Sequence, residues 1–262
     1  MKIRNKAVKN SYLMIFDLVH KGLENPKFCL IYIFSKLINI SKQNDFIYDE
    51  ALNEVNLSEI LNINTVVSLL QRHFNLSHGS RLPVIAIYSI YQELFKQIKR
   101  YDDKTLTVPN VHTSSDKHGF GDVEIWNADG TPFEMVEIKH NIPIDRNMIF
   151  DIVKKSQGTT IQRYYLLTTN VENFINFEEE QYINKFILQI KKDFNLEVIA
   201  NGIIYSIKYY LRFIENYNQF ILTYTKNLIN DSKNSTEIKE SHIEFWLNEI
   251  KAHNIENQTN FS

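Results

Sequence analysis

The sequence predicts an α/β fold: a small mixed central β-sheet flanked by many helices, with helical N- and C-terminal regions. Apolar residues recur every three or four positions before residue 100 and again after residue 170, which is typical of helices packed on a core. Between these regions the apolar period changes to two, as half-buried strands require. Of the 262 residues, 44% are hydrophobic and only 7 are Gly and 5 Pro. This composition excludes disordered and collagen-like chains.

The first hundred residues are predicted to be helical. Pro26 stands where a helix can begin, and Ser77-His78-Gly79-Ser80 has the composition of a loop. The helices are expected over residues 12–19, 28–40, 65–74 and 83–100.

The middle of the chain predicts a β-hairpin followed by a crossover to a parallel strand. Asn127-Ala-Asp-Gly130 has the composition of a tight turn between two alternating segments. A helical segment and a compact apolar run follow, and strand, helix and strand in this order suggest a parallel pair. The strands are expected at 106–108, 122–126, 133–139 and 164–169, with a helix over 147–157.

After residue 170 the chain is expected to be mostly helical, over about 174–194, 203–228 and 238–253, with an edge strand at 197–200. The second of these helices is rich in aromatic residues. Core packing explains this stripe most simply, and stacking on nucleic-acid bases is the alternative. The stripe consists of Tyr205, Tyr209, Tyr210, Phe213 and Tyr217. The predicted organisation is therefore a helical region 1–79, a core 80–170 and a mostly helical region 171–262 packed on that core.

Charge and targeting signals place weak limits on function. No apolar stretch reaches the length of a membrane span, and the start of the chain lacks a signal-peptide core, so a cytoplasmic protein is expected. The single Cys29 excludes an internal disulfide. Residues 1–42 carry eight Lys and Arg against two acids. This basic arm is either a solvated helix face or a phosphate-binding surface, in which Lys2, Arg4, Lys6 and Lys9 would take part.

The residues most suited to chemistry lie on the predicted hairpin. Glu137 and Lys139 are two apart on one strand, so they project from the same face, while Val136 and Ile138 point into apolar packing. The turn brings Asp122 of the other strand toward them. Two carboxylates near one point can bind a hard divalent cation such as Mg²⁺, and a lysine beside them could stabilise charge during attack on phosphorus. The alternative is an ordinary exposed hairpin whose Glu and Lys form a solvated pair.

This arrangement resembles the PD-(D/E)xK nuclease superfamily, whose restriction endonucleases have a helix, a hairpin bearing Asp and then Glu-x-Lys, a helix and another strand. The resemblance covers roughly residues 80–170 and implies a restriction endonuclease-like core. It implies that Asp122 and Glu137 are metal carboxylates and that Lys139 is the catalytic lysine. Gly121 stands where the motif often has Pro. The resemblance also implies Mg²⁺ as cofactor, for which Mn²⁺ could substitute.

The function implied by the resemblance is a type II restriction enzyme, an endonuclease that hydrolyses phosphodiester bonds of double-stranded DNA. Such an enzyme would act as a homodimer, without membrane partners, alongside a cognate DNA methyltransferase. Two alternatives remain open: a structure-specific repair or recombination nuclease, and a non-catalytic DNA- or protein-binding module. The intact set of two acids and a lysine argues against the non-catalytic module.

Relatives in the superfamily also suggest accessory residues. Several place an acid on the helix before the hairpin, and Glu93 is the only acid within residues 83–100. It is expected to face either solvent or the site, where it would be a third metal carboxylate. Gln162 matches an accessory polar position of some relatives. His118 could contact phosphate or a base, and the spacing of His112, His118 and His140 fits no zinc pattern.

Overall fold

The computed structural model describes residues 6–56, 61–109 and 119–260. Contacts divide the chain into two compact units, residues 1–49 and 50–262. The first contains α1 (Lys6–His20) and most of α2 (Pro26–Asn56). No residue of α1 is buried, and many large apolar side chains of this unit are exposed. Lys6 and Lys9 are exposed on α1, whereas Lys2 and Arg4 lie outside the described residues.

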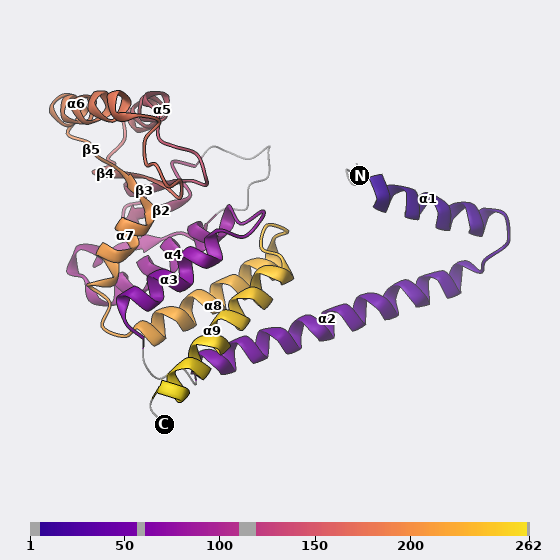
Figure 1. Ribbon diagram of the computed structural model, residues 1–262. Helices are drawn as coiled ribbons and strands as arrows, with labels where there is room; N and C mark the ends of the chain where they lie inside the picture. Colours follow the sequence, from indigo (N-terminus) through magenta and orange to yellow (C-terminus); the bar gives the residue numbers. More distant parts are fainter. Residues whose placement is uncertain (1–5, 57–60, 110–118, 261–262) are drawn as a thin grey trace. The chain divides into compact units, whose positions relative to one another are not determined.

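The second unit has a five-stranded mixed sheet with helices on both faces (Figure 1). Its strands are β1 (Lys104–Leu106), β2 (Val123–Asn127), β3 (Pro132–Lys139), β4 (Arg163–Thr168) and β5 (Glu197–Gly202). Its helices are α3 (Ile63–Phe74), α4 (Arg81–Gln97), the 3-10 turn η1 (Lys99–Tyr101), α5 (Arg146–Ser156), α6 (Phe177–Phe194), α7 (Ile203–Leu211), α8 (Tyr217–Asn234) and α9 (Glu240–Asn260). The predicted α/β class with a small mixed sheet is confirmed.

The strand order is β1-β2-β3-β4-β5, so the sheet follows the chain. The first three strands are antiparallel, and β3, β4 and β5 are parallel. The predicted hairpin, the crossover through α5 and the edge strand β5 are all confirmed. In the parallel part Lys139 pairs with Thr168, which pairs with Gly202. The carboxyl ends of these three strands therefore form one edge of the sheet.

One face of the sheet packs against α5 and α6 (Figure 1). Asp145 caps α5, because its side chain accepts a hydrogen bond from the backbone N–H of Met148 at 2.9 Å. Ile149 and Ile152 of α5 are buried together with Met135 of β3. Burying such side chains contributes roughly 1.5–3 kcal/mol each. This apolar contact fixes which side of α5 faces β3.

The opposite face of β3 holds a buried polar cluster against α4. Glu134 is fully buried, and its Oε1 accepts hydrogen bonds from the hydroxyls of Tyr91 (2.7 Å) and Tyr101 (3.0 Å). Its Oε2 pairs with Arg100 at 3.0 Å. A buried carboxylate needs such partners, because it has lost its hydration. Since side chains alternate along β3, Glu134 and Glu137 lie on opposite faces of the sheet.

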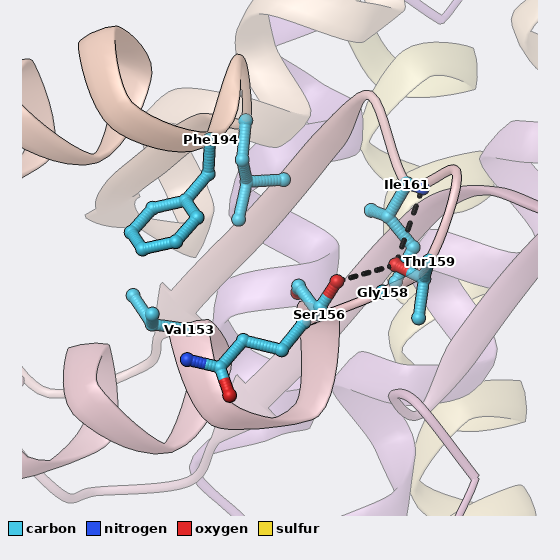
Figure 2. A pocket seen from close by; sticks show the side chains of 8 residues that line it. Val153, Ser156, Gly158, Thr159, Ile161 and Phe194 are labelled. Carbon is cyan, nitrogen blue, oxygen red and sulfur yellow. Dashed lines mark hydrogen bonds between the residues drawn. The ribbon is translucent and has the colours of Figure 1, made fainter.

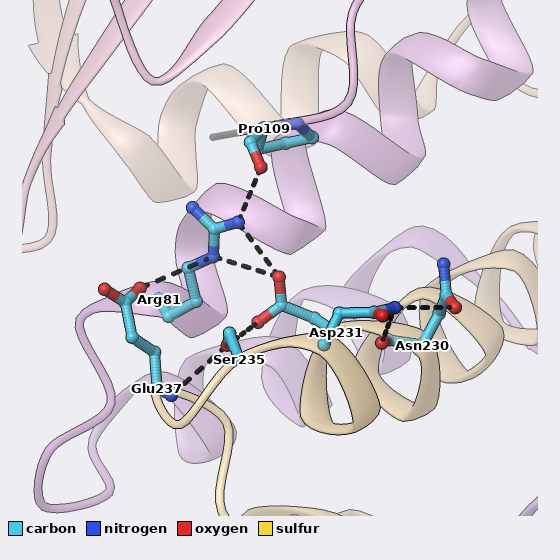
Figure 3. A network of polar contacts seen from close by, with 7 residues as sticks. Arg81, Pro109, Asn230, Asp231, Ser235 and Glu237 are labelled. Carbon is cyan, nitrogen blue, oxygen red and sulfur yellow. Dashed lines mark hydrogen bonds and ion pairs between the residues drawn. The ribbon is translucent and has the colours of Figure 1, made fainter. Parts of the chain in front are cut away.

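A second buried ion pair ties the start of α4 to the end of α8 (Figure 3). The guanidinium of Arg81 contacts Asp231 at 2.9 Å and donates to the carbonyl of Pro109 at 2.9 Å. Ser235 donates to the other oxygen of Asp231 at 2.9 Å. Breaking a buried pair by removing one partner costs several kcal/mol. The pair therefore holds the C-terminal region against α4.

Two expectations for the C-terminal region were wrong. The helix expected over 203–228 is interrupted between α7 and α8, where the side chain of Asn216 caps α8 by accepting from Gln219 N at 2.9 Å. Core packing of the aromatic stripe holds for Tyr210, which is buried. Three other members are exposed at 69% (Tyr205), 53% (Tyr209) and 43% (Phe213).

The bounds of other elements also differ from the expectation. The helix expected over 28–40 extends to Asn56, and the helix expected from 174 begins at Phe177, after the capping residue Asn176. The strand expected at 106–108 is β1, which ends at Leu106. Among the helices that the structure describes, none combines the length and the apolar character that crossing a bilayer requires.

Candidate functional site

Asp122 is hydrogen-bonded to the residues on both sides of Glu137. Its backbone N–H donates to the carbonyl of Val136 at 2.8 Å. Its Oδ2 accepts from the backbone N–H of Ile138 at 2.7 Å. Both bonds run between the residue that precedes β2 and the second half of β3, so the hairpin fixes Asp122 beside Glu137. The predicted convergence of Asp122 on the Glu-x-Lys segment is present in the structure.

The loop before Asp122 depends on two glycines and on Glu124. A Cβ on Gly121 would lie 2.7 Å from the carbonyl oxygen of Val136, and a Cβ on Gly119 would lie 2.6 Å from Glu124 Oε1. Both distances are too short for a side chain, so glycine permits the close approach. The buried Glu124 Oε1 accepts from the backbone N–H groups of Phe120 (2.6 Å) and Gly121 (3.2 Å). Glu124 therefore stabilises the loop that precedes Asp122.

Glu137 lies between two lysines. Lys139 Nζ is 2.6 Å from Glu137 Oε1, and Lys155 Nζ, from α5, is 3.6 Å from Glu137 Oε2. The side chains of Glu137, Lys139 and Lys155 are 18%, 29% and 40% exposed. They line a depression of about 50 Å³ together with Asp151 and neighbouring residues. The site is accessible to solvent and carries both signs of charge.

The negative charge of this site affects the pKa of Tyr164 on β4. Its hydroxyl donates a hydrogen bond to the carbonyl of Phe120. Burial raises the pKa of Tyr164, and the charges of Glu137 and Asp122 raise it further. Tyr164 lines the same depression as Glu137, on the face of the sheet that α5 covers. The phenol stays protonated and can donate a hydrogen bond.

The carboxylate pair fits a Mg²⁺ site with few protein ligands. Within residues 6–56, 61–109 and 119–260 there is no group of three or more His, Cys, Asp and Glu that could hold a metal ion. Mg²⁺ is commonly bound by one or two carboxylates, with water and substrate phosphate completing its shell. Asp122 and Glu137 supply hard oxygen donors on adjacent strands. The two residues satisfy this limited requirement, and a three-acid cage is not formed.

Glu93 does not join this pair, so the expectation of a third carboxylate at the site is corrected. The side chain of Glu93 is buried, accepts from Thr223 of α8 at 2.6 Å, and pairs with Lys96 at 2.8 Å. Because α4 packs along α8, this flank of the helix faces neither solvent nor the hairpin. Glu93 is part of the contact between two helices.

We expect Glu93→Gln to lower the free energy of unfolding by about 1–3 kcal/mol, since hydrogen bonds that involve a buried charge are weakened. Urea unfolding measures this effect, and Thr223→Val is the matched variant on the other side of the contact. A Glu93→Gln variant with the parental free energy of unfolding would contradict this structural role of Glu93.

Two of the polar residues considered for the site, Gln162 and His140, do not lie at the carboxylates. Gln162 is exposed, and its backbone N–H bonds the carbonyl of Phe133, at the other end of β3 from Lys139. His140 Nδ1 lies 3.1 Å from Thr169 Oγ1, so His140 contacts the strand end and not the carboxylates. His112 and His118 lie outside the described residues.

A larger cavity of about 220 Å³ lies at the ends of α5 and α6 (Figure 2). Its lining is a mixture of apolar and hydroxyl or amide side chains, without a carboxylate. It borders Ile161 and Leu196, which precede β4 and β5, whereas the carboxylates lie toward the other ends of the strands. This cavity is not the site of the predicted chemistry. The lining residues are Val153, Ser156, Gln157, Gly158, Thr159, Ile161, Phe194 and Leu196.

Sequence reasoning missed Lys155, Asp151, Tyr164 and Glu124. Glu124 alternates with Asp122 along the hairpin strand, so the period-two pattern could have placed the two on one face. Lys155 follows the buried Ile152 by three positions on α5, which puts it near the same helix face. That face could be assigned to β3 only once the packing of α5 was known.

The sequence matches no protein-family model, and no curated protein matches it.

Proposed function

We propose that this chain is a Mg²⁺-dependent endodeoxyribonuclease built on a restriction endonuclease-like core, in which Asp122 and Glu137 hold the metal and Lys139 acts on the substrate phosphate. One observation carries the proposal: Asp122 is hydrogen-bonded on both sides of Glu137, while Lys139 lies 2.6 Å from the Glu137 carboxylate. The strand order, with the hairpin followed by α5 and the parallel strand β4, agrees with the resemblance described above.

In this proposal the acidic residues of the site bind the metal, and the lysine acts on the phosphate. When bound, Mg²⁺ would supply a Lewis acid for phosphodiester hydrolysis. Asp122 and Glu137 would provide the negative charge that retains a divalent cation at this end of the hairpin. The ammonium of Lys139 would stabilise negative charge that develops on a phosphate oxygen. Glu124 and the two glycines hold the Asp122 loop in place.

The wider proposal is a type II restriction enzyme that acts on double-stranded DNA, as a homodimer, alongside a cognate methyltransferase. Duplex recognition sites with two-fold symmetry favour two-fold symmetric proteins. The carboxylates and lysines of the site are exposed enough to be reached by a phosphate backbone. A type II enzyme would cut at defined sequences, which is the property that distinguishes it most directly.

Incubation of the purified chain with unmethylated phage DNA and Mg²⁺ tests this function. We expect discrete fragments, whose formation stops when EDTA removes the metal. Methylated DNA of the same phage is the matched substrate, because a restriction enzyme is blocked by methylation of its site. Intact phage DNA in the presence of Mg²⁺ and of Mn²⁺ would contradict the restriction function.

The exposed aromatic stripe favours a second candidate, a nuclease that acts on branched or single-stranded DNA. Tyr205 and Tyr209 are solvent-exposed on α7, and Phe213 is exposed just after this helix ends. The guanidinium of Arg212 lies 4.4 Å from the Tyr209 ring centroid. Aromatic side chains beside cations can stack on unpaired bases. α7 begins after Gly202, two strands from Lys139, which is roughly 10 Å at the usual spacing between strands.

A branched junction and a linear duplex of the same sequence separate the two candidates. Cleavage that is confined to the junction would favour the structure-specific nuclease. Cleavage of the duplex at one sequence would favour the restriction enzyme.

A further inference from the structure

Both oxygens of the Glu137 carboxylate face an ammonium group. Lys139, from the same strand, lies at Oε1, and Lys155, from α5, lies at Oε2. A divalent cation that binds Glu137 must compete with two positive charges that already neutralise it. Lysine ammonium groups on flexible stems can move to another anion. The two ammonium groups therefore oppose the binding of a cation to this carboxylate.

The position of Lys155 follows from the packing of α5. Ile149 and Ile152 are buried against the sheet, which orients the helix. Lys155, three positions after Ile152, is thereby brought to Glu137. Lys154, its neighbour, is exposed, and no ion pair is recorded for it among the described residues. Asp151 lies one turn before Lys155 and lines the same depression. Lys154 and Lys155 are therefore both exposed lysines on α5, but of the two only Lys155 contacts Glu137 within the described residues.

We propose that Lys155 and Lys139 form a clamp on Glu137 that couples metal binding to phosphate binding. A DNA phosphate attracts the two ammonium groups, and the released carboxylate then accepts the divalent cation. This inference rests on the proposed function, because it assigns a metal and a phosphate to the same site. Coupling between two ligands is reciprocal, so the metal must strengthen phosphate binding by the same factor.

Mn²⁺ binding, followed by electron paramagnetic resonance on the full chain without DNA, tests the clamp directly. Lys155→Met keeps most of the apolar stem and removes the charge. We expect this variant to bind Mn²⁺ about 2- to 5-fold more tightly, the scale of a partly exposed ion pair. Lys154→Met is the matched control and should bind as the parent does. The part of the bound-Mn²⁺ signal that is lost in Asp122→Asn is the part that belongs to this site.

The coupling is measured by repeating the titration with an excess of a 20-bp duplex, after subtraction of the Mn²⁺ that the duplex binds alone. The parent should gain affinity when DNA is present, and Lys155→Met should gain less. Equal affinities of the parent, Lys155→Met and Lys154→Met would overturn the clamp while leaving the nuclease proposal standing. A parent that binds no Mn²⁺ at this site with or without DNA would overturn both. Circular dichroism verifies that each variant is folded.

Discussion

We expect Lys139→Ala to lose about 100- to 1,000-fold of its cleavage rate, the scale found when one donor that stabilises transition-state charge is removed. DNA affinity should change far less, because charge on the phosphate oxygens develops mainly in the transition state. The position of the Lys139 ammonium, 2.6 Å from Glu137 Oε1, supports this role, since a substrate phosphate near the carboxylates would lie within its reach. Single-turnover cleavage and fluorescence anisotropy measure the two quantities.

Two variants control this experiment. Lys154→Ala removes a lysine from the neighbouring exposed position of α5 and should cleave at the parental rate. Lys139→Arg keeps the charge but changes its shape, and should recover part of the rate at most, because a planar guanidinium does not replace a compact ammonium. Cleavage by Lys139→Ala at the parental rate would remove Lys139 from the proposed chemistry.

The hairpin and its site could be predicted because they depend on short sequence distances. Polar and apolar residues alternate along most of β2 and at the end of β3, and the turn between them has its own composition, so the hairpin follows from local rules. The register shift between Ile125 and Trp126 has no such local signal. Asp122, Glu137 and Lys139 lie within this one hairpin. Their convergence needed no knowledge of the remaining chain.

Glu93 shows where local reasoning ends. The stripe of apolar residues on α4 suggested two sides, but almost every residue from Arg81 to Leu94 is buried. No side of such a helix can be assigned to solvent from its own sequence. The partner that fixes Glu93 is Thr223, 130 positions later in the chain. Only the packing of α8 on α4 shows that the carboxylate is used there.

The aromatic stripe was misassigned for a related physical reason. An aromatic residue at helical spacing is usually part of a core, but α7 already has an aliphatic face. Ile203, Ile207 and Leu211 are buried together with Tyr210, and they occupy the side that packs on the sheet and on α4. Tyr205, Tyr209 and Phe213 must then lie on the other side. Hydrophobicity alone could not rank the two faces.

The second large effect is expected at Asp122, whose replacement by Asn should lower cleavage by about 100- to 1,000-fold, equivalent to several kcal/mol of lost charge stabilisation. Asn has nearly the same shape, and its side-chain oxygen can still accept the hydrogen bond from Ile138 N. The backbone bond to Val136 is also kept, because it does not involve the side chain. The hairpin should therefore remain folded, and the loss should come from charge.

Metal binding distinguishes this loss from a structural one. A single remaining carboxylate is a poor anchor for a strongly hydrated ion, so Asp122→Asn should bind Mn²⁺ much more weakly than the parent. Asp129→Asn is the matched control, since Asp129 lies in the turn of the same hairpin, where it accepts hydrogen bonds from Thr131. It removes an equal charge at the far end of the strands. An Asp122→Asn variant with parental Mn²⁺ affinity would show that the cation is held elsewhere. Asp122 is the carboxylate that the hairpin holds beside Glu137, through its hydrogen bonds to Val136 and Ile138.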